Sequence, residues 1–288
     1  MFWTTVVLAS VALAQKPTPI QQEAPTLSLT FGVYQSDKAT VMYRQFTPVL
    51  DALMAAMESR LQRPVDIKLT IFRSYDDGIE SVARGDVDFV RFGPAPYITA
   101  KSKQADLELL AMETENGDKR FKGVVIVQKN SPIQSLKDLK GKKFAFGDPN
   151  STIGRYLVQA ELFKAGITGR DLAEYKYLGR HDIVVKAVEI GDFDAGSVME
   201  QVYEKANTKG HLRVLASFDN VTKPWVARKG LDPAVRDAIR QSLFELKDPA
   251  TLKELKISGF VATSDEEYQP VRDGMRLAEE FEIPRSGQ

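Results

Sequence analysis

The fold of this chain is decided by residues 142–157, KKFAFGDPNSTIGRYL. The apolar run behind the two lysines has the length of a buried strand, and the breakers Gly147 to Asn150 end it. Ser151 or Thr152 then suits a helix N-cap, and the apolar spacing of a helix continues until Gly166 stops it. The stretch therefore predicts a strand, a tight turn and a helix.

The start of such a helix is a suitable place for an anion. Its first backbone N–H groups have no partner within the helix, and the helix dipole is positive there. The hydroxyls of Ser151 and Thr152 would add two neutral donors for an oxyanion. The alternative is that one of these hydroxyls only caps the helix.

Composition limits the possible functions. The chain has 288 residues, 43% of them hydrophobic, which suggests two domains or one two-lobed unit. Lys plus Arg and Asp plus Glu number 39 each, so no basic excess favours nucleic acid or an anionic membrane surface. The absence of cysteine excludes thiolate catalysis, disulfides and cysteine-bound zinc, and two histidines, His181 and His211, are too few for a multi-histidine site. We therefore expect no metal and no cofactor.

The N-terminus has the features of an export signal. Residues 2–14 form an apolar run that ends Ala12-Leu13-Ala14, which fits the A-x-A rule for cleavage before Gln15. The run is too short to span a bilayer. We expect a signal peptide at residues 1–14, a flexible leader at 15–26, and a mature periplasmic protein with no membrane-inserted segment. The alternative is a buried strand or helix that begins the fold.

Strands and helices alternate along the remaining chain. Strands are expected at 27–33, 65–72, 88–92, 107–113, 123–128, 144–146, 174–178, 193–198 and 212–216. Helices are expected at 43–61, 75–84, 97–103, 135–139, 151–165, 181–190, 200–207, 233–247, 249–255 and 265–281. This alternation predicts an α/β fold with mostly parallel sheets flanked by helices.

The order of these elements suggests two lobes. Residues 121–222 would form lobe 2, inserted into a discontinuous lobe 1 made of 27–120 and 223–288. Ligands of open α/β sheets bind beyond the carboxyl ends of strands, where loops meet helix starts. We therefore expect the binding site in the cleft between the lobes.

The spacing of several short motifs resembles a known family. The motifs are Gly147-Asp148-Pro149-Asn150-Ser151-Thr152-x-Gly154, Gly179-x-His181, Ala187-Val188-x-x-Gly191-x-x-Asp194-Ala195, Asp86-Val87-Asp88-Phe89 with Gly93-Pro94 and Tyr97, Ser131-Pro132-Ile133, and Leu136-x-Asp138-Leu139-x-Gly141. From about residue 29 to 231 they resemble the phosphate/phosphite/phosphonate-binding proteins of ABC importers. The resemblance implies a type II periplasmic binding-protein fold with two lobes, two crossover strands and hinge closure.

The same resemblance implies a set of residues for the oxyanion pocket. They are Tyr75, Ser151, Thr152, Ile153, Gly154 and His181. The serine and threonine would supply hydroxyls, the next two residues would supply helix N–H groups, and the tyrosine and histidine would complete the pocket. The alternatives are a packing role for the tyrosine and a local hydrogen bond for the histidine.

Three further positions correspond to residues that contact the ligand in the family, and at some of them this chain has a different residue type. The family's second tyrosine falls near Phe121, which lacks the hydroxyl. In aminoalkylphosphonate binders a glutamate and an aspartate hold the ligand ammonium, and these fall near Glu200 and on Lys223. A lysine would repel an ammonium, although Glu200 could offset its charge by pairing with it. We therefore expect little binding of aminoethylphosphonate and a preference for phosphate, phosphite or methylphosphonate.

Three functions fit these features to different degrees. The resemblance implies an extracytoplasmic substrate-binding component that carries a small phosphorus oxyanion to a membrane ABC permease. A periplasmic sensor subunit that reports to a membrane kinase could use the same fold. A phosphoryl-group hydrolase would need Ser151 as nucleophile and His181 as base, and no acid is evidently placed to orient that histidine. We therefore predict a binding protein and not an enzyme.

We predict that the mature protein begins at Gln15, because Ala12-Leu13-Ala14 fits the cleavage rule. Mass spectrometry of a periplasmic extract should find the mass of residues 15–288. Soluble protein that retains Met1 would contradict the prediction.

Overall fold

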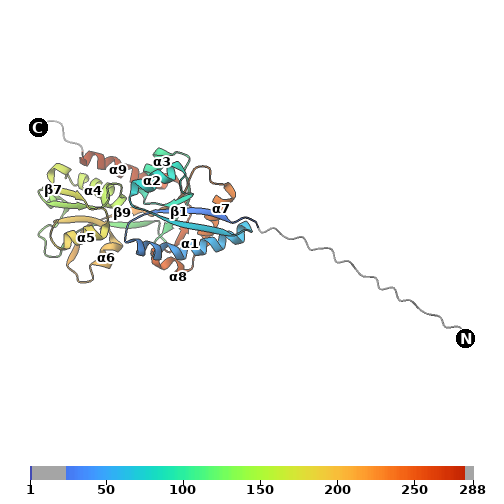
Figure 1. Cartoon of the computed structure of the whole chain (residues 1–288). Coiled ribbons are helices and arrows are strands. Elements are labelled where there is room, and N and C mark those ends of the chain that lie inside the picture. The colour runs from blue at the N-terminus through green and yellow to red at the C-terminus, as the bar shows by residue number, and fades with distance from the viewer. Residues whose placement is uncertain (2–23, 283–288) are drawn as a thin grey trace.

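The computed structural model describes Met1 and residues 24–282 as two lobes, each with one β-sheet and helices packed on it (Figure 1). Apart from Met1, the expected signal peptide lies outside the described residues, as does most of the expected leader. Within residues 24–282 no helix combines the length and the apolar character that a membrane span requires.

Lobe 1 contains a six-stranded sheet in the order β11-β4-β10-β3-β1-β2. Its strands are β1 (Leu27–Tyr34), β2 (Val65–Phe72), β3 (Phe89–Arg91), β4 (Glu108–Thr114), β10 (Pro224–Ala227) and β11 (Gly259–Val261). Its helices are α1 (Ala39–Leu61), α2 (Tyr75–Arg84), α3 (Pro94–Lys103), α7 (Pro233–Glu245) and α8 (Pro249–Leu252). Short 3-10 helices at Lys253–Leu255 and Asp265–Tyr268 belong to the same part of the chain.

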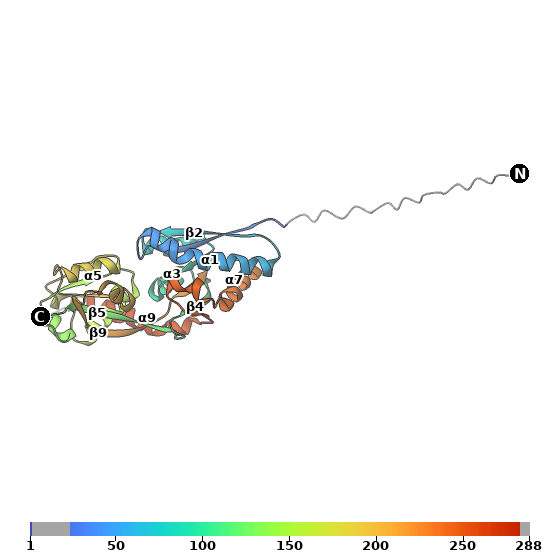
Figure 2. The same cartoon turned by 90° about the horizontal axis from the view of Figure 1, so that it is seen from below.

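Lobe 2 contains a five-stranded sheet in the order β7-β6-β8-β5-β9. Its strands are β5 (Arg120–Gln128), β6 (Lys143–Phe146), β7 (Glu174–Tyr177), β8 (Ala195–Met199) and β9 (Leu212–Val221). Its helices are α4 (Val158–Lys164), α5 (His181–Glu189) and α6 (Glu200–Ala206), with short 3-10 helices at Leu136–Leu139 and Gly169–Asp171. Figure 2 shows the two lobes side by side along the long axis of the molecule.

Both sheets are mixed, although the sequence predicts mostly parallel ones. Strands joined by helices pair in parallel, as β1 does with β2 and β3 and as β6 does with β7 and β8. The strand that arrives from the other lobe enters antiparallel: β10 lies between β3 and β4, and β5 lies between β8 and β9. In each sheet the strand that comes from the other lobe therefore runs against both of its neighbours, and in lobe 1 the edge strand β11 also runs antiparallel to β4.

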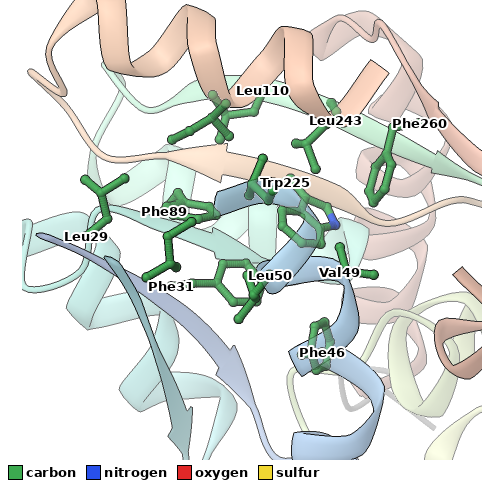
Figure 3. Close-up of a cluster of buried hydrophobic side chains, with 14 of the residues drawn as sticks. Leu29, Phe31, Phe46, Val49, Leu50, Phe89, Leu110, Trp225, Leu243 and Phe260 are labelled. Atoms are coloured by element: carbon green, nitrogen blue, oxygen red, sulfur yellow. The ribbon is translucent and has the colours of Figure 1, made fainter. Parts of the chain in front are cut away.

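Aromatic rings fill the centre of lobe 1 (Figure 3). Trp225 of β10 is fully buried and stacks on Phe31 of β1, with ring centroids 4.6 Å apart. Phe260 of β11 meets the indole edge-on at 5.3 Å. Burying rings of this size contributes much of the stability of a core, because apolar area leaves water. The returning strand β10 is thus fixed in the middle of the lobe that it rejoins.

Three segments connect the lobes. The crossovers are the antiparallel pair β5 and β9, whose lobe-1 ends meet where Arg120 lies opposite Val221. The third segment is α9 (Gln269–Glu282), which runs along both lobes (Figure 1). Its residue Val271 joins a lobe-1 core cluster, whereas Phe281 joins the core of lobe 2. The end of the chain therefore departs from the expected assignment of all of 223–288 to lobe 1.

The segment 142–157 forms the expected strand and turn, but the helix begins differently. Residues Thr152–Leu157 form a π-helical turn, in which the Tyr156 N–H reaches back five residues to the Ser151 carbonyl at 3.2 Å. The regular helix α4 follows. Wide turns of this kind are rare and occur often at functional sites. The sequence pattern does not reveal this turn, because six residues are too few for a change of period to be recognised.

Two glycines bring this turn against the end of β6. The Gly147 N–H donates to the Gly154 carbonyl at 2.8 Å. A Cβ atom on Gly154 would lie 2.8 Å from the Gly147 Cα, which is closer than real Cβ contacts. Only residues without side chains permit this backbone approach.

We predict that Gly154→Ala destabilises the protein by roughly 1–3 kcal/mol, since the added methyl group has no space. Urea unfolding followed by circular dichroism measures the change. Lys164→Ala, an exposed position at the end of α4, serves as the control and should change stability by no more than about 0.5 kcal/mol. Wild-type stability in Gly154→Ala would show that the contact is not needed.

Candidate functional site in the interlobe cleft

A cavity of about 350 Å³ lies in the cleft between the lobes. Most of the residues predicted for the site line it: Tyr75, Phe121, Ser151, Thr152, Ile153, His181 and Lys223. Gly154 and Glu200 do not. The remaining lining residues were not predicted, and they include Tyr34, Arg91 and Asn220. Both lobes and both crossovers thus contribute walls.

The hydroxyls of the π-helical turn form one end of the cavity. The Ser151 Oγ accepts a hydrogen bond from the Gly154 N–H at 2.9 Å. The Thr152 Oγ1 accepts one from the Ala95 N–H at 2.9 Å, and Ala95 lies in the first turn of α3 in the other lobe. Both side chains are buried. A hydroxyl that accepts from a backbone N–H still has its own proton to donate.

The expected role of Gly154 changes with this geometry. Its N–H was expected to bind the ligand, but it donates to the Ser151 side chain instead. The N-cap hydrogen bond therefore takes up the one donor that the residue offers. Its contribution is the close contact with Gly147, which holds the turn in place.

Two stacked tyrosines face this end from lobe 1. Tyr75 begins α2 because Ser74 caps the helix, accepting from the Asp77 N–H at 3.1 Å. Its ring stacks on that of Tyr34, with centroids 3.6 Å apart, and the Tyr34 hydroxyl accepts from the Gly93 N–H at 2.9 Å. Burial raises the pKa of both phenols, that of Tyr75 strongly. Both hydroxyls are therefore protonated at neutral pH.

His181 is the first residue of α5 and lies buried in the cavity wall. Its Nδ1 has no hydrogen-bond partner within residues 24–282. Burial, together with the nearby Lys223 ammonium, lowers the pKa of the imidazole to about 4. At neutral pH the ring is uncharged, with one nitrogen as donor and the other as acceptor.

Lys223 lies buried in the wall formed by the crossovers. Its Nζ lies 3.4 Å from a Glu115 carboxylate oxygen and 4.2 Å from the centre of the Phe121 ring. Burial lowers the pKa of the ammonium, and the Arg91 charge adds to this effect. The cation is thus compensated by a carboxylate and by the face of an aromatic ring.

The expected pairing of Lys223 with Glu200 is wrong. Glu200 is the first residue of α6, and its neighbour Gln201 is the one that lines the cleft. Gln201 donates to Glu115 at 2.6 Å, so a single carboxylate at the start of the crossover holds both side chains. Glu115 gave no sequence signal, since it lies beyond the strand expected at 107–113.

Arg91 and Glu113 form a second buried ion pair close to Lys223. Arg91 of β3 binds Glu113 of β4 through two hydrogen bonds of 2.9 Å, and the Trp225 indole N–H donates to the same carboxylate at 3.0 Å. Burial alone would raise the pKa of Glu113, but the Arg91 guanidinium more than offsets it, so the pKa lies below its usual value. The pair is ionised and fixes the Arg91 side chain at the cavity wall.

Asn220 is the least expected member of the site. It lies in β9 opposite Phe121 of β5 and is 2% exposed. Within the described residues neither its Nδ2 nor its Oδ1 has a hydrogen-bond partner. The sequence placed the end of this strand near residue 216, so the position fell outside every expected element.

No arrangement of three or more histidine or acidic side chains suited to a metal ion occurs in the described part of the chain. The groups described above offer a ligand the neutral donors of the turn and the tyrosines, one neutral imidazole, one carboxamide without a protein partner and two paired cations. The lining also includes Asp37, Asp182, Lys205 and Lys256. This set suits a small anion with several oxygen atoms, because such an anion is held well by convergent donors.

Comparison with known proteins agrees with this reading. Residues 31–268 match the family model for the periplasmic phosphonate substrate-binding proteins of ABC transporters. A protein of Prochlorococcus marinus (strain MIT 9301), described as a probable ABC transporter phosphite binding protein, is 30% identical over 230 residues, covering 71% of this chain and 76% of its own length. A phosphate-import protein of Mycolicibacterium smegmatis is 23% identical over 264 residues, covering 86% of this chain and 79% of its own.

The fold is also shared with solved structures. The structure of PhnD1 from Prochlorococcus marinus (MIT 9301) in complex with methylphosphonate superposes with a TM-score of 0.75 at 23% identity, covering 88% of this chain and 98% of the other. The periplasmic aliphatic sulphonate binding protein SsuA of Escherichia coli superposes with a TM-score of 0.59, covering 90% of this chain and 92% of its own. The expected type II binding-protein fold is thereby confirmed, and this chain belongs to the family of periplasmic substrate-binding proteins of phosphonate ABC transporters.

Proposed function

We propose that the cavity binds a small phosphorus oxyanion (phosphate, phosphite or an alkylphosphonate) for delivery to a membrane ABC permease. The proposal rests on one observation. Three buried hydroxyls, those of Tyr34, Ser151 and Thr152, each accept a backbone N–H and keep a proton to donate. Such a set is fixed in place before the ligand arrives, so little ordering is needed on binding.

The electrostatics of the cleft support a neutral cradle for this anion. Arg91 and Lys223 are paired with Glu113 and Glu115, and His181 is uncharged at neutral pH. Neutral donors stabilise an oxyanion without the desolvation cost of burying an unpaired cation. The Lys223 ammonium itself lies in the cavity wall and would oppose an ammonium tail placed beside it.

The ligands named for two relatives fit the same cavity. The Prochlorococcus marinus structure holds methylphosphonate, and the Mycolicibacterium smegmatis relative is named as a phosphate importer. Both ligands are tetrahedral and carry three or more oxygen atoms. Their common geometry, and not their fourth substituent, matches the donors of Ser151 and Thr152.

We propose further that the lobes close over the ligand. Contacts already join them across the cleft: Thr152 to Ala95, and the Asn150 amide to Asp76 at 3.0 Å. The lobes would hinge where the crossovers leave lobe 1, near residues 119–123 and 217–224. Lobe 2 would then comprise residues 121–222, together with the packed end of α9.

Binding without turnover fits the geometry better than hydrolysis does. Ser151 is engaged as a helix cap, and within residues 24–282 no hydrogen bond joins it to His181. A nucleophile needs such a base within reach. The relatives are binding proteins of transporters, which accords with this proposal.

We predict that isothermal titration calorimetry detects binding of phosphate, phosphite or methylphosphonate to the mature protein. Thr152→Ala should weaken it about tenfold, because one donor to the anion and one contact between the lobes are lost. Thr152→Ser keeps the hydroxyl and should stay within about threefold of wild type. If the wild type binds none of the three ligands, or if Thr152→Ala binds like the wild type, the proposed site is wrong.

We also predict that protonation of His181 makes the stability of the protein depend on pH. Its pKa is 6.5 as a free side chain and about 4 in the fold, so between these values the unfolded chain binds the extra proton. The contribution of the uncharged imidazole to the free energy of unfolding is therefore fully present above pH 6.5, and it is lost as the pH falls toward 4. Between pH 7.5 and pH 5 the ligand-free protein should lose about 2 kcal/mol from this one group.

Urea unfolding at both pH values tests this effect. His181→Asn should lack this component of the loss, whereas His211→Asn, a change at an exposed position, should keep it. Equal pH dependence in the wild type and His181→Asn would contradict the buried, neutral state of the ring.

A further inference from the structure

We propose that Asn220 reads the substituent of the ligand and selects a hydroxyl group. The preferred ligand would be a phosphorus oxyanion that turns a hydroxyl toward the crossover strands, either the P–OH of phosphate or the hydroxyl of a hydroxyalkylphosphonate. The inference rests on the proposed function and goes further, because it names the group that lies beyond the shared oxygen atoms.

The position of Asn220 places its carboxamide at the back wall of the cleft. It lies one residue before the end of β9, opposite Phe121, and both residues line the cavity. Lys223 follows three residues later, with its ammonium over the Phe121 ring. The amide is therefore flanked by an apolar ring and a paired cation.

The carboxamide has no hydrogen-bond partner within the described part of the chain. Both of its polar atoms are buried without a partner among the described residues. Two other asparagines show the usual pattern: Asn207 exchanges two hydrogen bonds of 2.9 Å with the backbone of Leu212, and Asn150 donates to Asp76. Buried polar groups almost always have partners, so an unpaired amide in the wall of a cavity points to a partner that enters the cavity.

The chemistry of an amide restricts what that partner can be. Its NH₂ donates and its oxygen accepts, so a matching group must do both. The unprotonated oxygens of an oxyanion only accept, and a methyl group or a P–H bond does neither. An ammonium would donate, but Lys223 and Arg91 oppose a second cation. A hydroxyl accepts from Nδ2 and donates to Oδ1, and it satisfies the site.

The space in the cleft permits either source of this hydroxyl. A cavity of about 350 Å³ lies within the usual range for small-molecule sites and exceeds the need of a four-oxygen anion. Phosphate carries the hydroxyl on the phosphorus itself, whereas hydroxymethylphosphonate carries it one carbon atom further out.

Two matched ligand pairs, each exchanging hydroxyl for methyl, test the proposal by calorimetry. The pairs are phosphate with methylphosphonate, and hydroxymethylphosphonate with ethylphosphonate. The wild type should prefer the hydroxyl ligand by tenfold or more in at least one pair, because the methyl analogue leaves the buried amide unpaired. A preference in the first pair assigns the P–OH, and one in the second assigns the hydroxyalkyl group.

Asn220→Leu replaces the amide by an apolar group of similar shape and should reduce this preference to about threefold or less. Ser242→Ala is the matched control, since its hydroxyl is also buried and unpaired but lies in α7, away from the cavity. It should keep the wild-type preference. If Asn220→Leu does not fold, a crystal structure of the wild type with the preferred hydroxyl ligand decides, and the hydroxyl should lie within hydrogen-bond distance of Asn220 Oδ1.

The outcomes separate this inference from the proposed function. Equal binding within both pairs, or a preference that survives Asn220→Leu, overturns the role of Asn220 while leaving the oxyanion site intact. An amide bonded only to water in the complex has the same meaning. Failure of all four ligands to bind would overturn the proposed function itself.

Discussion

The contact between the backbones of Gly147 and Gly154 is the constraint on which the site depends. This contact holds the π-helical turn before α4 against the end of β6. Residues 148–153, between the two glycines, therefore lie at the cleft. Ser151 and Thr152 are carried there together, one capping its own helix and the other reaching Ala95 in the opposite lobe. The π-helical turn provides the extra residue that this path needs. A side chain at either glycine would displace both hydroxyls at once.

In the cavity wall formed by the crossovers, every charge described above is buried together with a partner of opposite sign. Isolated ions are costly to bury, and a buried ion pair stabilises little unless its hydrogen bonds are complete. Glu113 meets this condition through Arg91 and the Trp225 indole, and Glu115 does so through Lys223 and Gln201. The resulting wall is rigid and nearly neutral. Under the proposals above, ligand choice at this wall would depend on hydrogen-bonding groups more than on net charge.

The sequence predicts the alternating elements, the two lobes and most of the cradle because these depend on local signals. A breaker cluster after a short apolar run defines the turn that holds Ser151 and Thr152, and the spacing to His181 carries the family resemblance. Contacts that depend on long-range geometry are not visible in this way. Glu115 lies outside any regular element that could be expected, and only the tertiary structure brings it to Lys223 in place of Glu200. Asn220 was missed because β9 continues five residues beyond its apolar pattern to become a crossover.

The last helix has a mechanical consequence for the molecule. Glu282 at its end accepts hydrogen bonds from Tyr177 and Gln159 and pairs with Arg155, all on lobe 2, while its first turns pack on lobe 1. A pair of neighbouring strands such as β5 and β9 can bend easily about one axis and can also twist. A helix such as α9, which packs on both lobes away from these strands, opposes twist more than bending. In the closure proposed above, this attachment would favour a motion close to a single rotation, and the same donors would then return to the same positions each time.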